Sequence, residues 1–361
     1  MTAMRYHRSP MVTPRRSPKR RVHFRPYRWA DYDDDALLKL RLRDLRLRVD
    51  GSLVQPEVFA LYDELGRRGI EFQPHVWLSE EWFSPDGVPG IAVPFFVAHP
   101  RLRQLERRIM GDVDGGSSLW RLRLLRHEAG HALDTAYGLR KRADWRRIFG
   151  PASTRYPGTY MPRPSSSHHV LHLGHWYAQS HPTEDFAETF AVWLQPKARW
   201  RRDYAEWPGA IEKLEFVNTL MDEIAGTPPL VCDRGSIEPL SENDKTLGQH
   251  YRRKRARYDR IERRYDAWLL RDFATRPARP RAVQANRFIR EIEPQLRRLL
   301  VRRARLHPYL VDHAIATIMR RVEQLDLVLR DSPRDSKRRV VRLHERVVLD
   351  VLRRNREKYT L

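Results

Sequence analysis

Two histidines and a glutamate on one predicted helix are the residues best suited to chemistry. His127, Glu128 and His131 form a His-Glu-x-x-His pattern inside a helix that we expect over 117–137. Because residues four apart lie one turn apart on the same helix face, both imidazoles can bind one Zn²⁺, and the carboxylate beside the first can reach a water on the metal. The alternative is an exposed, charged helix face that carries two ordinary histidines.

A glycine interrupts the same helix between the two histidines. Gly130 lies at mid-helix, where glycine costs about 1 kcal/mol relative to alanine. This cost is understandable if another segment packs directly against the helix backbone, because a side chain would then keep the two segments apart. We therefore expect a close neighbour at Gly130.

A third metal ligand is needed, and the segment after His131 does not provide one. Residues 132–137 contain no glycine or histidine, which excludes the continuation typical of metzincins. A second helix, predicted over 182–194, carries Glu184 and Glu188 four residues apart. Two like charges repel at this spacing, but the pair becomes favourable if Glu184 binds the metal and Glu188 accepts the N–H of a ligating histidine. The alternative is a solvated acidic stripe.

Three segments of the chain resemble a known family of proteins. Residues 82–92, 126–131 and 176–191 are together similar to the bacterial zinc-binding metallopeptidase family, and the resemblance extends over residues 35–260. More distantly, the two helical motifs resemble the catalytic domains of anthrax lethal factor and the bacterial Pro-Pro endopeptidases. The resemblance implies a gluzincin-like domain with Zn²⁺ as its cofactor and a peptide or protein as its substrate.

The more distant of these proteins carry a tyrosine seven residues before the ligand glutamate, where it helps to stabilise an oxyanion. Tyr177 stands seven residues before Glu184, so the resemblance implies that Tyr177 is the phenolic donor in this chain. Without that spacing, Tyr177 would be interpreted as a core or loop residue. Asp185 departs from those proteins, which have an aromatic residue at this position.

Together these residues predict a zinc-dependent metallohydrolase, specifically a peptidase. The expected zinc ligands are His127, His131 and Glu184. Glu128 would act as general base on a zinc-bound water, and Tyr177 would stabilise the oxyanion. A zinc domain that no longer cleaves is a further alternative. The presence of Glu128 argues against it, because a purely structural site needs no base.

The remaining pattern predicts an α+β fold, with a zincin-like domain and an α-helical C-terminal region. Apolar and aromatic runs within 72–78 and 91–97 favour strands of a small antiparallel sheet, with a turn at 84–87 between them. Pro94 places the second strand at a sheet edge, where an extended peptide could add as a further strand along 91–96. Further helices are expected over 31–47, 56–68, 101–110 and 208–225, with mostly helical sequence over 241–354.

Charge divides the chain of 361 residues into three parts. Residues 1–29 carry +9, residues 30–240 carry −3 and residues 241–361 carry +17, which gives the net charge of +23. We therefore expect a basic disordered tail over 1–29, a catalytic domain over 30–240 and a basic helical region over 241–361. Arginine-rich helices can also serve only to keep a protein dispersed.

The basic ends support an alternative from a different class, a nucleic-acid-associated protein. Tyr27 and Trp29 in the tail, and Tyr251, Tyr258 and Tyr265 among later arginines, could stack on bases. In this alternative the zinc site is structural or acts on proteins bound to nucleic acid. No recognised nucleic-acid-binding motif occurs in the sequence, and the same helices can equally pack on the catalytic domain.

Further histidines precede the second motif helix. His168, His169, His172 and His175 could form a second metal site, although their spacing fits no established ligand pattern. His181, directly before a proline, is better suited to a helix start than to catalysis.

The compartment is indicated by what the sequence lacks. Cys232 is the single cysteine, so no intramolecular disulfide can form. The N-terminal residues show no apolar signal-peptide core, and no segment has the roughly 18 apolar residues of a membrane span. We expect a cytoplasmic protein without a membrane partner.

Overall fold

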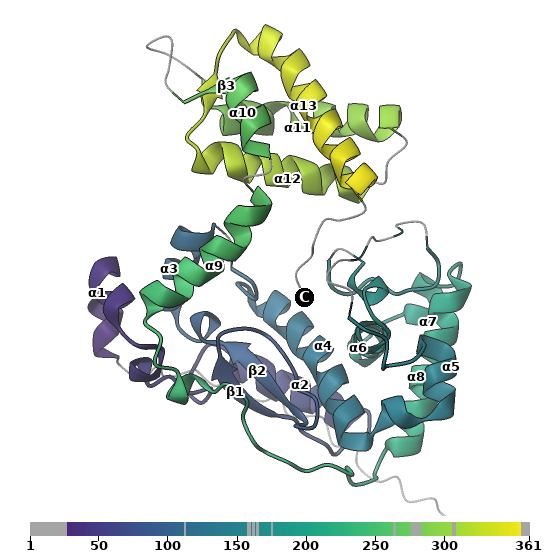
Figure 1. The fold of residues 1–361 in the computed structure, drawn as a ribbon. Coiled ribbons are helices and arrows are strands. Elements are labelled where there is room, and N and C mark those ends of the chain that lie inside the picture. The colour runs from purple at the N-terminus through teal and green to yellow at the C-terminus, as the bar shows by residue number, and fades with distance from the viewer. Residues whose placement is uncertain are drawn as a thin grey trace, which may run out of the picture.

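The structure, a computed structural model, is a mixed α/β fold that is mostly helical (Figure 1). It describes residues 27–354 with internal gaps at 112, 157–159, 161–162, 164–165, 175, 263–264, 276–282 and 305–307. Residues 1–26 of the predicted disordered tail therefore lie outside the described residues.

The α-helices of the described chain are α1 (Asp34–Lys39), α2 (Gln55–Arg67), α3 (Pro100–Met110), α4 (Ser118–Tyr137), α5 (Ala143–Phe149), α6 (Pro182–Leu194), α7 (Trp200–Asp203), α8 (Pro208–Ile224), α9 (Leu247–Glu262), α10 (Asp266–Asp272), α11 (Ala285–Ala304), α12 (Pro308–Gln324) and α13 (Pro333–Arg354). The strands are β1 (His75–Ser79), β2 (Gly90–Pro94), β3 (Phe273–Ala274) and β4 (Val328–Leu329). In this described part, none of the helices has the length and apolar character that crossing a membrane requires.

The helix that carries the His-Glu-x-x-His pattern is defined by its two ends. The side chain of Ser117 accepts the N–H of Trp120 at the start of α4, and Gly138 ends the helix with a φ of +64°. The predicted helices at α2, α3, α4, α6 and α8 are confirmed to within a residue or two at their ends. The helix predicted over 31–47 is wrong in length, because α1 ends at Lys39 and a short 3-10 turn follows at 42–45.

The sheet in the N-terminal half is parallel, so the predicted antiparallel sheet is wrong. β1 pairs with β2 in parallel, with His75 opposite Gly90. A turn does form at the predicted place, where Gly87 has a φ of +83°. This turn connects Phe83 to β2, and Phe83 forms a single antiparallel bridge with Ala92. The bridge lies on the side of β2 that β1 does not cover. One residue of β2 thus has a neighbour on both sides.

The strand β2 does not form an exposed sheet edge. All residues of β2 are buried, and the chain turns after Pro94 into a buried 3-10 helix over 95–97. Proline ends the ladder here because it has no N–H to donate. The predicted addition of a substrate strand along 91–96 is therefore wrong, since this backbone is covered.

Two separate hydrophobic cores form in the described chain. The first includes residues from Trp29 to Tyr251, and the second includes residues from Tyr265 to Val348. The first core continues past the predicted boundary at residue 240, because the start of α9 packs into it. The end of the predicted tail is ordered: Trp29 is buried, and its Nε1–H donates to the carbonyl of Leu45 at 3.0 Å.

Two buried ion pairs attach α4 to α2. Arg121 lies 2.7 Å from Glu57, and Arg126 donates to both carboxylate oxygens of Glu64 at 2.7 Å. All four side chains are buried. Since leaving one charge of a buried pair alone costs about 3–5 kcal/mol, these pairs restrict the rotation of α4 and direct its histidines away from α2.

A segment that follows α8 lies along β1. The indole N–H of Trp77 donates to a main-chain carbonyl of this segment at 3.0 Å, the hydroxyl of Ser79 donates to another at 2.8 Å, and Nε2 of His75 lies 2.5 Å from a third. These three carbonyls belong to residues within 235–238, which we call the β1 strap.

Candidate metal centre

The two motif helices approach each other very closely. α4 packs against α6, and a Cβ added to Gly130 would lie only 2.9 Å from the Cα of Ala187. The predicted close neighbour of Gly130 is therefore confirmed, and a larger residue would force the helices apart. Ala187 lies between Glu184 and Glu188, so this contact sets the distance from α4 to both carboxylates.

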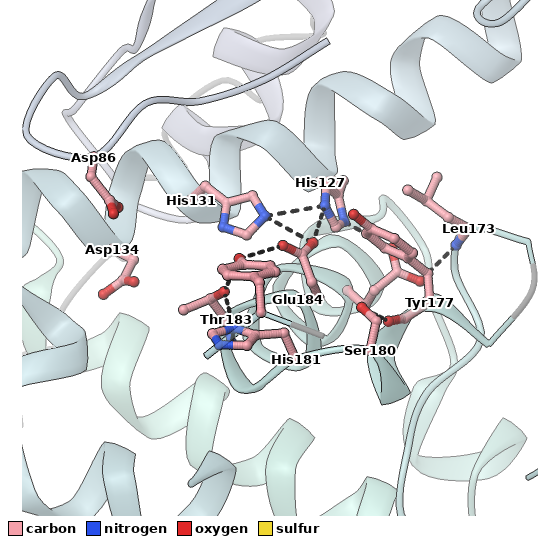
Figure 2. A network of polar contacts seen from close by, with 12 residues as sticks. Asp86, His127, His131, Asp134, Leu173, Tyr177, Ser180, His181, Thr183 and Glu184 are labelled. Atoms are coloured by element: carbon pink, nitrogen blue, oxygen red, sulfur yellow. Dashed lines mark hydrogen bonds and ion pairs between the residues drawn. The ribbon is translucent and has the colours of Figure 1, made fainter. Parts of the chain in front are cut away.

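Three predicted ligand atoms converge between these helices (Figure 2). Oε2 of Glu184 lies 3.0 Å from Nε2 of His127 and 3.2 Å from Nε2 of His131, and the two nitrogens lie 3.2 Å apart. A tetrahedral zinc ion with bonds of about 2.0–2.1 Å separates its ligand atoms by about 3.3 Å. The three residues thus form a buried group that could hold a metal ion.

Glu188 fixes the orientation of His127. Nδ1 of His127 lies 2.9 Å from Oε1 of Glu188, and because a carboxylate only accepts, Nδ1 carries the proton. When the ring is neutral, as a metal ligand must be, Nε2 then presents its lone pair to the point where Glu184 and His131 meet. The other oxygen of Glu188 accepts the backbone N–H of Leu173 at 2.8 Å, so this carboxylate is held through both oxygens.

Tyr156 also holds the ligand glutamate, and the sequence did not reveal it. Its hydroxyl donates to Oε1 of Glu184 at 2.7 Å and lies 2.5 Å from Oγ1 of Thr183. Its ring stacks on His181, which caps α6 by accepting the N–H of Thr183 as predicted. Tyr156 thus engages the oxygen of Glu184 that does not face the histidines. It lies in the long loop predicted over 150–174, where no periodic pattern marks individual residues.

The charges of the group favour a cation. Burial lowers the pKa of His127, but hydrogen bonds and charge from Glu184 and Glu188 outweigh it, so this pKa is raised well above its usual value. Burial raises the pKa of Glu184, but His131 and His127 outweigh it, so that pKa is well below its usual value. The carboxylates therefore stabilise positive charge at the point where the three ligand atoms meet.

Glu128 lies beside the ligand atoms without a partner of its own. Its side chain is buried, and it forms no hydrogen bond or ion pair with any residue that the structure describes. Burial raises the pKa of Glu128, and the nearby His127 and His131 lower it by less. A buried carboxylate that is free to take up a proton suits the role of a general base.

Tyr177 stands directly before α6, in the short 3-10 helix Tyr177–Gln179. Its ring centroid lies 5.5 Å from that of His127, and Figure 2 shows the two rings side by side. The hydroxyl makes no hydrogen bond within the described chain. Burial, and then the charges of Glu184 and Glu128, raise the pKa of Tyr177 well above its usual value, so the phenol stays protonated and can donate.

Asp185, which departs from the resembling proteins, belongs to the packing of α6 on α8. Its carboxylate accepts a hydrogen bond from Nζ of Lys213 at 2.6 Å, and Nε2 of His169 lies 3.7 Å away. His172 is buried and donates from Nε2 to a backbone carbonyl of α4 at 2.9 Å. Among the described residues these histidines form no second metal-ligand group, and His175 lies outside them.

The aromatic residues that could have stacked on bases are mostly buried. Trp29, Tyr251 and Tyr265 lie in the two hydrophobic cores and expose at most 6 % of their surface. Tyr27 packs on Trp29 with ring centroids 4.9 Å apart. The side chain of Tyr258 lies outside the described residues. The buried rings cannot serve as stacking platforms for bases.

In comparisons with known proteins, no family model matches the chain, and no curated protein or solved structure matches it. The resemblance to zinc metallopeptidases therefore stays a prediction, and function is inferred from the geometry of the site.

Proposed function

We propose that this protein is a zinc-dependent peptidase with a zincin-like catalytic domain of the gluzincin type. One observation carries the proposal: Nε2 of His127, Nε2 of His131 and Oε2 of Glu184 meet at 3.0–3.2 Å from one another, beside the buried Glu128, which has no hydrogen-bond partner among the described residues. Two nitrogens and one carboxylate oxygen are the ligand set of His₂Glu zinc peptidases. A zinc ion held there would supply Lewis acidity, which polarises a carbonyl and makes a water molecule more acidic.

Glu128 is the proton carrier in this proposal. It follows His127 directly in α4, its side chain is buried, and the charges of His127 and His131 act on its carboxylate. It accepts a proton from the attacking water and passes it to the departing amine. The absence of any described hydrogen-bond partner leaves both oxygens of Glu128 available for this transfer.

Tyr177 acts on the substrate in this proposal, whereas Glu188 and Tyr156 orient the ligands. The phenol of Tyr177, which makes no hydrogen bond within the described chain, donates to the oxyanion that develops when a substrate carbonyl is attacked. Glu188 keeps the proton of His127 on Nδ1, and Tyr156 keeps one oxygen of Glu184 occupied, so that the ligand atoms stay oriented toward one another.

Metal content tests the site itself. Wild-type protein, stripped with a chelator and reconstituted with zinc, is expected to bind one metal ion per chain, whereas Glu184→Ala retains little. Glu215→Ala is the matched control, because it removes a partly exposed glutamate that pairs with Arg201 on the surface. Equal metal content in wild type and Glu184→Ala, or no zinc uptake by either, would contradict the proposal.

Activity tests the chemistry. Wild-type protein with zinc is incubated with a peptide library, and new termini are identified by mass spectrometry, with Glu128→Gln as the inactive control. Glu128→Gln keeps the size and position of the side chain but cannot act as a base. Cleavage that persists unchanged in this variant would show that Glu128 is not the base.

A further inference from the structure

A row of exposed arginines lies on one face of α13. Arg334, Arg338 and Arg342 follow one another at four-residue intervals, and all three are exposed. Residues four apart share a helix face and are about 6 Å apart along the axis, so the three charges form a line. None of the three forms a hydrogen bond or ion pair with a residue in the described part of the chain.

Two acidic groups near this row, one just before α13 and one in its first turn, are already engaged. Asp331 pairs with Arg339 at 2.8 Å, and Asp335 accepts a hydrogen bond from a serine hydroxyl in the same turn. Arg346, the next member of the row, stacks over the ring of Trp268 at 3.8 Å. Like charges at four-residue spacing destabilise a helix, so the row keeps positive charge that the described protein does not neutralise.

The helix α11, which packs against α13, also carries exposed arginines. Nζ of Lys337 donates to Oε1 of Gln295 at 2.6 Å and thereby connects the two helices. Arg298 and Arg302 follow Gln295 by about one and two turns, and both are exposed and without a partner among the described residues. They line a surface hollow of about 840 Å³.

We propose that this cationic surface, formed by Arg298, Arg302, Arg334, Arg338 and Arg342, binds the phosphate backbone of a nucleic acid. A line of cations about 6 Å apart complements a polymer that carries a phosphate about every 3.4 Å of each strand. Arginine is the side chain best suited to phosphate, because its guanidinium donates two parallel hydrogen bonds.

An anionic membrane is the less suitable partner. A helix that lies on a membrane needs an exposed apolar face opposite its basic face. The apolar face of α13 is instead buried in the second core through Val340, Leu343 and Val347. The exposed part of α13 can therefore offer charge but little apolar surface.

The contacts are with the backbone and carry no sequence preference. Tyr265, the aromatic residue of the second core with a sequence position among arginines, is buried and cannot stack on bases. Binding through charge alone releases counterions from the phosphates, so affinity depends steeply on salt. This dependence gives the proposal a quantitative test.

The test is fluorescence anisotropy with a labelled DNA duplex of mixed sequence, titrated with the full-length protein at several salt concentrations. In the triple variant Arg334→Gln, Arg338→Gln, Arg342→Gln, the slope of log affinity against log salt should fall by about 2.7, from about 0.9 per phosphate contact. Over a fourfold change in salt, this corresponds to a difference of roughly 40-fold in the loss of affinity. The matched triple variant with lysines should keep the slope.

A control variant has the same charge change elsewhere. Arg41→Gln, Arg43→Gln, Arg201→Gln also removes three exposed arginines, but each of these is paired with a carboxylate. Its slope should stay close to that of wild type. The proposal is overturned if wild type fails to bind the duplex at low salt, or if both glutamine variants change the slope equally. It is also overturned if the triple glutamine variant of α13 loses binding to phosphatidylserine vesicles but binds the duplex like wild type. Glu184→Ala should bind the duplex like wild type, which separates this result from the metal site.

Discussion

Two buried histidines, one in each core of the molecule, have opposite electrostatic surroundings. His344 lies in the second core, where burial lowers its pKa to about 4 and its Nδ1 donates to the carbonyl of Val340 at 2.7 Å. His127 is equally enclosed, yet Glu184 and Glu188 raise its pKa well above the usual value. Burial alone makes an imidazole neutral, so the carboxylates around His127 reverse the effect of burial and create a place for positive charge.

The regions that contain the first and second cores, which we call the first and second regions, also differ in how their arginines are paired. In the first region, arginines of α4 are buried and paired with carboxylates of α2. The five arginines of the cationic surface on α13 and α11 are instead exposed and lack a partner among the described residues. Paired charges position the candidate metal centre, whereas unpaired charges are available to an external partner. Four predictions test or sharpen this contrast, in order of decreasing expected effect.

Glu128→Gln should have the largest effect. Removal of a general base typically lowers turnover by about 10²–10⁴-fold. Metal content should stay at the wild-type level, because Glu128 is not among the three converging ligand residues. The measurement is kcat/KM on a peptide from the library, together with zinc content. A variant that loses both activity and zinc would indicate that Glu128 is needed for the site to form.

His344→Leu should reduce the acid sensitivity of the second region. The folded-state pKa of His344 is about 4, and the unfolded value is about 6.5. Since the unfolded chain takes up the proton first, this stability is fully present above pH 6.5 and is lost as the pH falls toward 4, by about 3 kcal/mol at most. Urea unfolding at about pH 7 and about pH 4.5 should show a smaller difference for the variant. An identical difference in both proteins would exclude this role of His344.

Gly130→Ala should destabilise the first region, although alanine is the better helix former. Its Cβ would lie 2.9 Å from the Cα of Ala187, and overpacking of this kind costs about 1–3 kcal/mol. Gly66→Ala in α2 is the matched control, because an added Cβ meets nothing within 4 Å and should stabilise by up to about 1 kcal/mol. Urea midpoints distinguish the two variants. Stabilisation by both would mean that α6 can move away without cost.

Tyr156→Phe should weaken metal binding and leave the fold intact. Loss of a group that orients a ligand typically lowers metal affinity by about 10–100-fold, and only the hydroxyl that bonds Glu184 is removed. Competition with a chelator of known affinity measures the change. Tyr177→Phe should keep the affinity of wild type and lower turnover instead. The opposite assignment of effects would exchange the roles of the two tyrosines.

The site was more predictable from the sequence than the surrounding fold, for physical reasons. His127, His131, Glu184 and Glu188 lie on two helices, whose regular spacing determines which side chains share a face. The direction of the sheet was missed because five-residue strands carry no signal that distinguishes parallel from antiparallel pairing. Tyr156 was missed because it lies in a loop, where position depends on tertiary contacts that spacing does not encode.

The β1 strap has a consequence for the order of events during synthesis. Trp77 and Ser79 donate to carbonyls that follow them in the chain by 160 and 159 residues. At roughly 5–20 residues per second, the ribosome needs roughly ten to thirty seconds to supply these partners. Until then, β1 lacks the cover of the strap, and Trp77 and Ser79 donate to water in place of these carbonyls. The cover of β1 is thus delayed until nearly two thirds of the protein has been made.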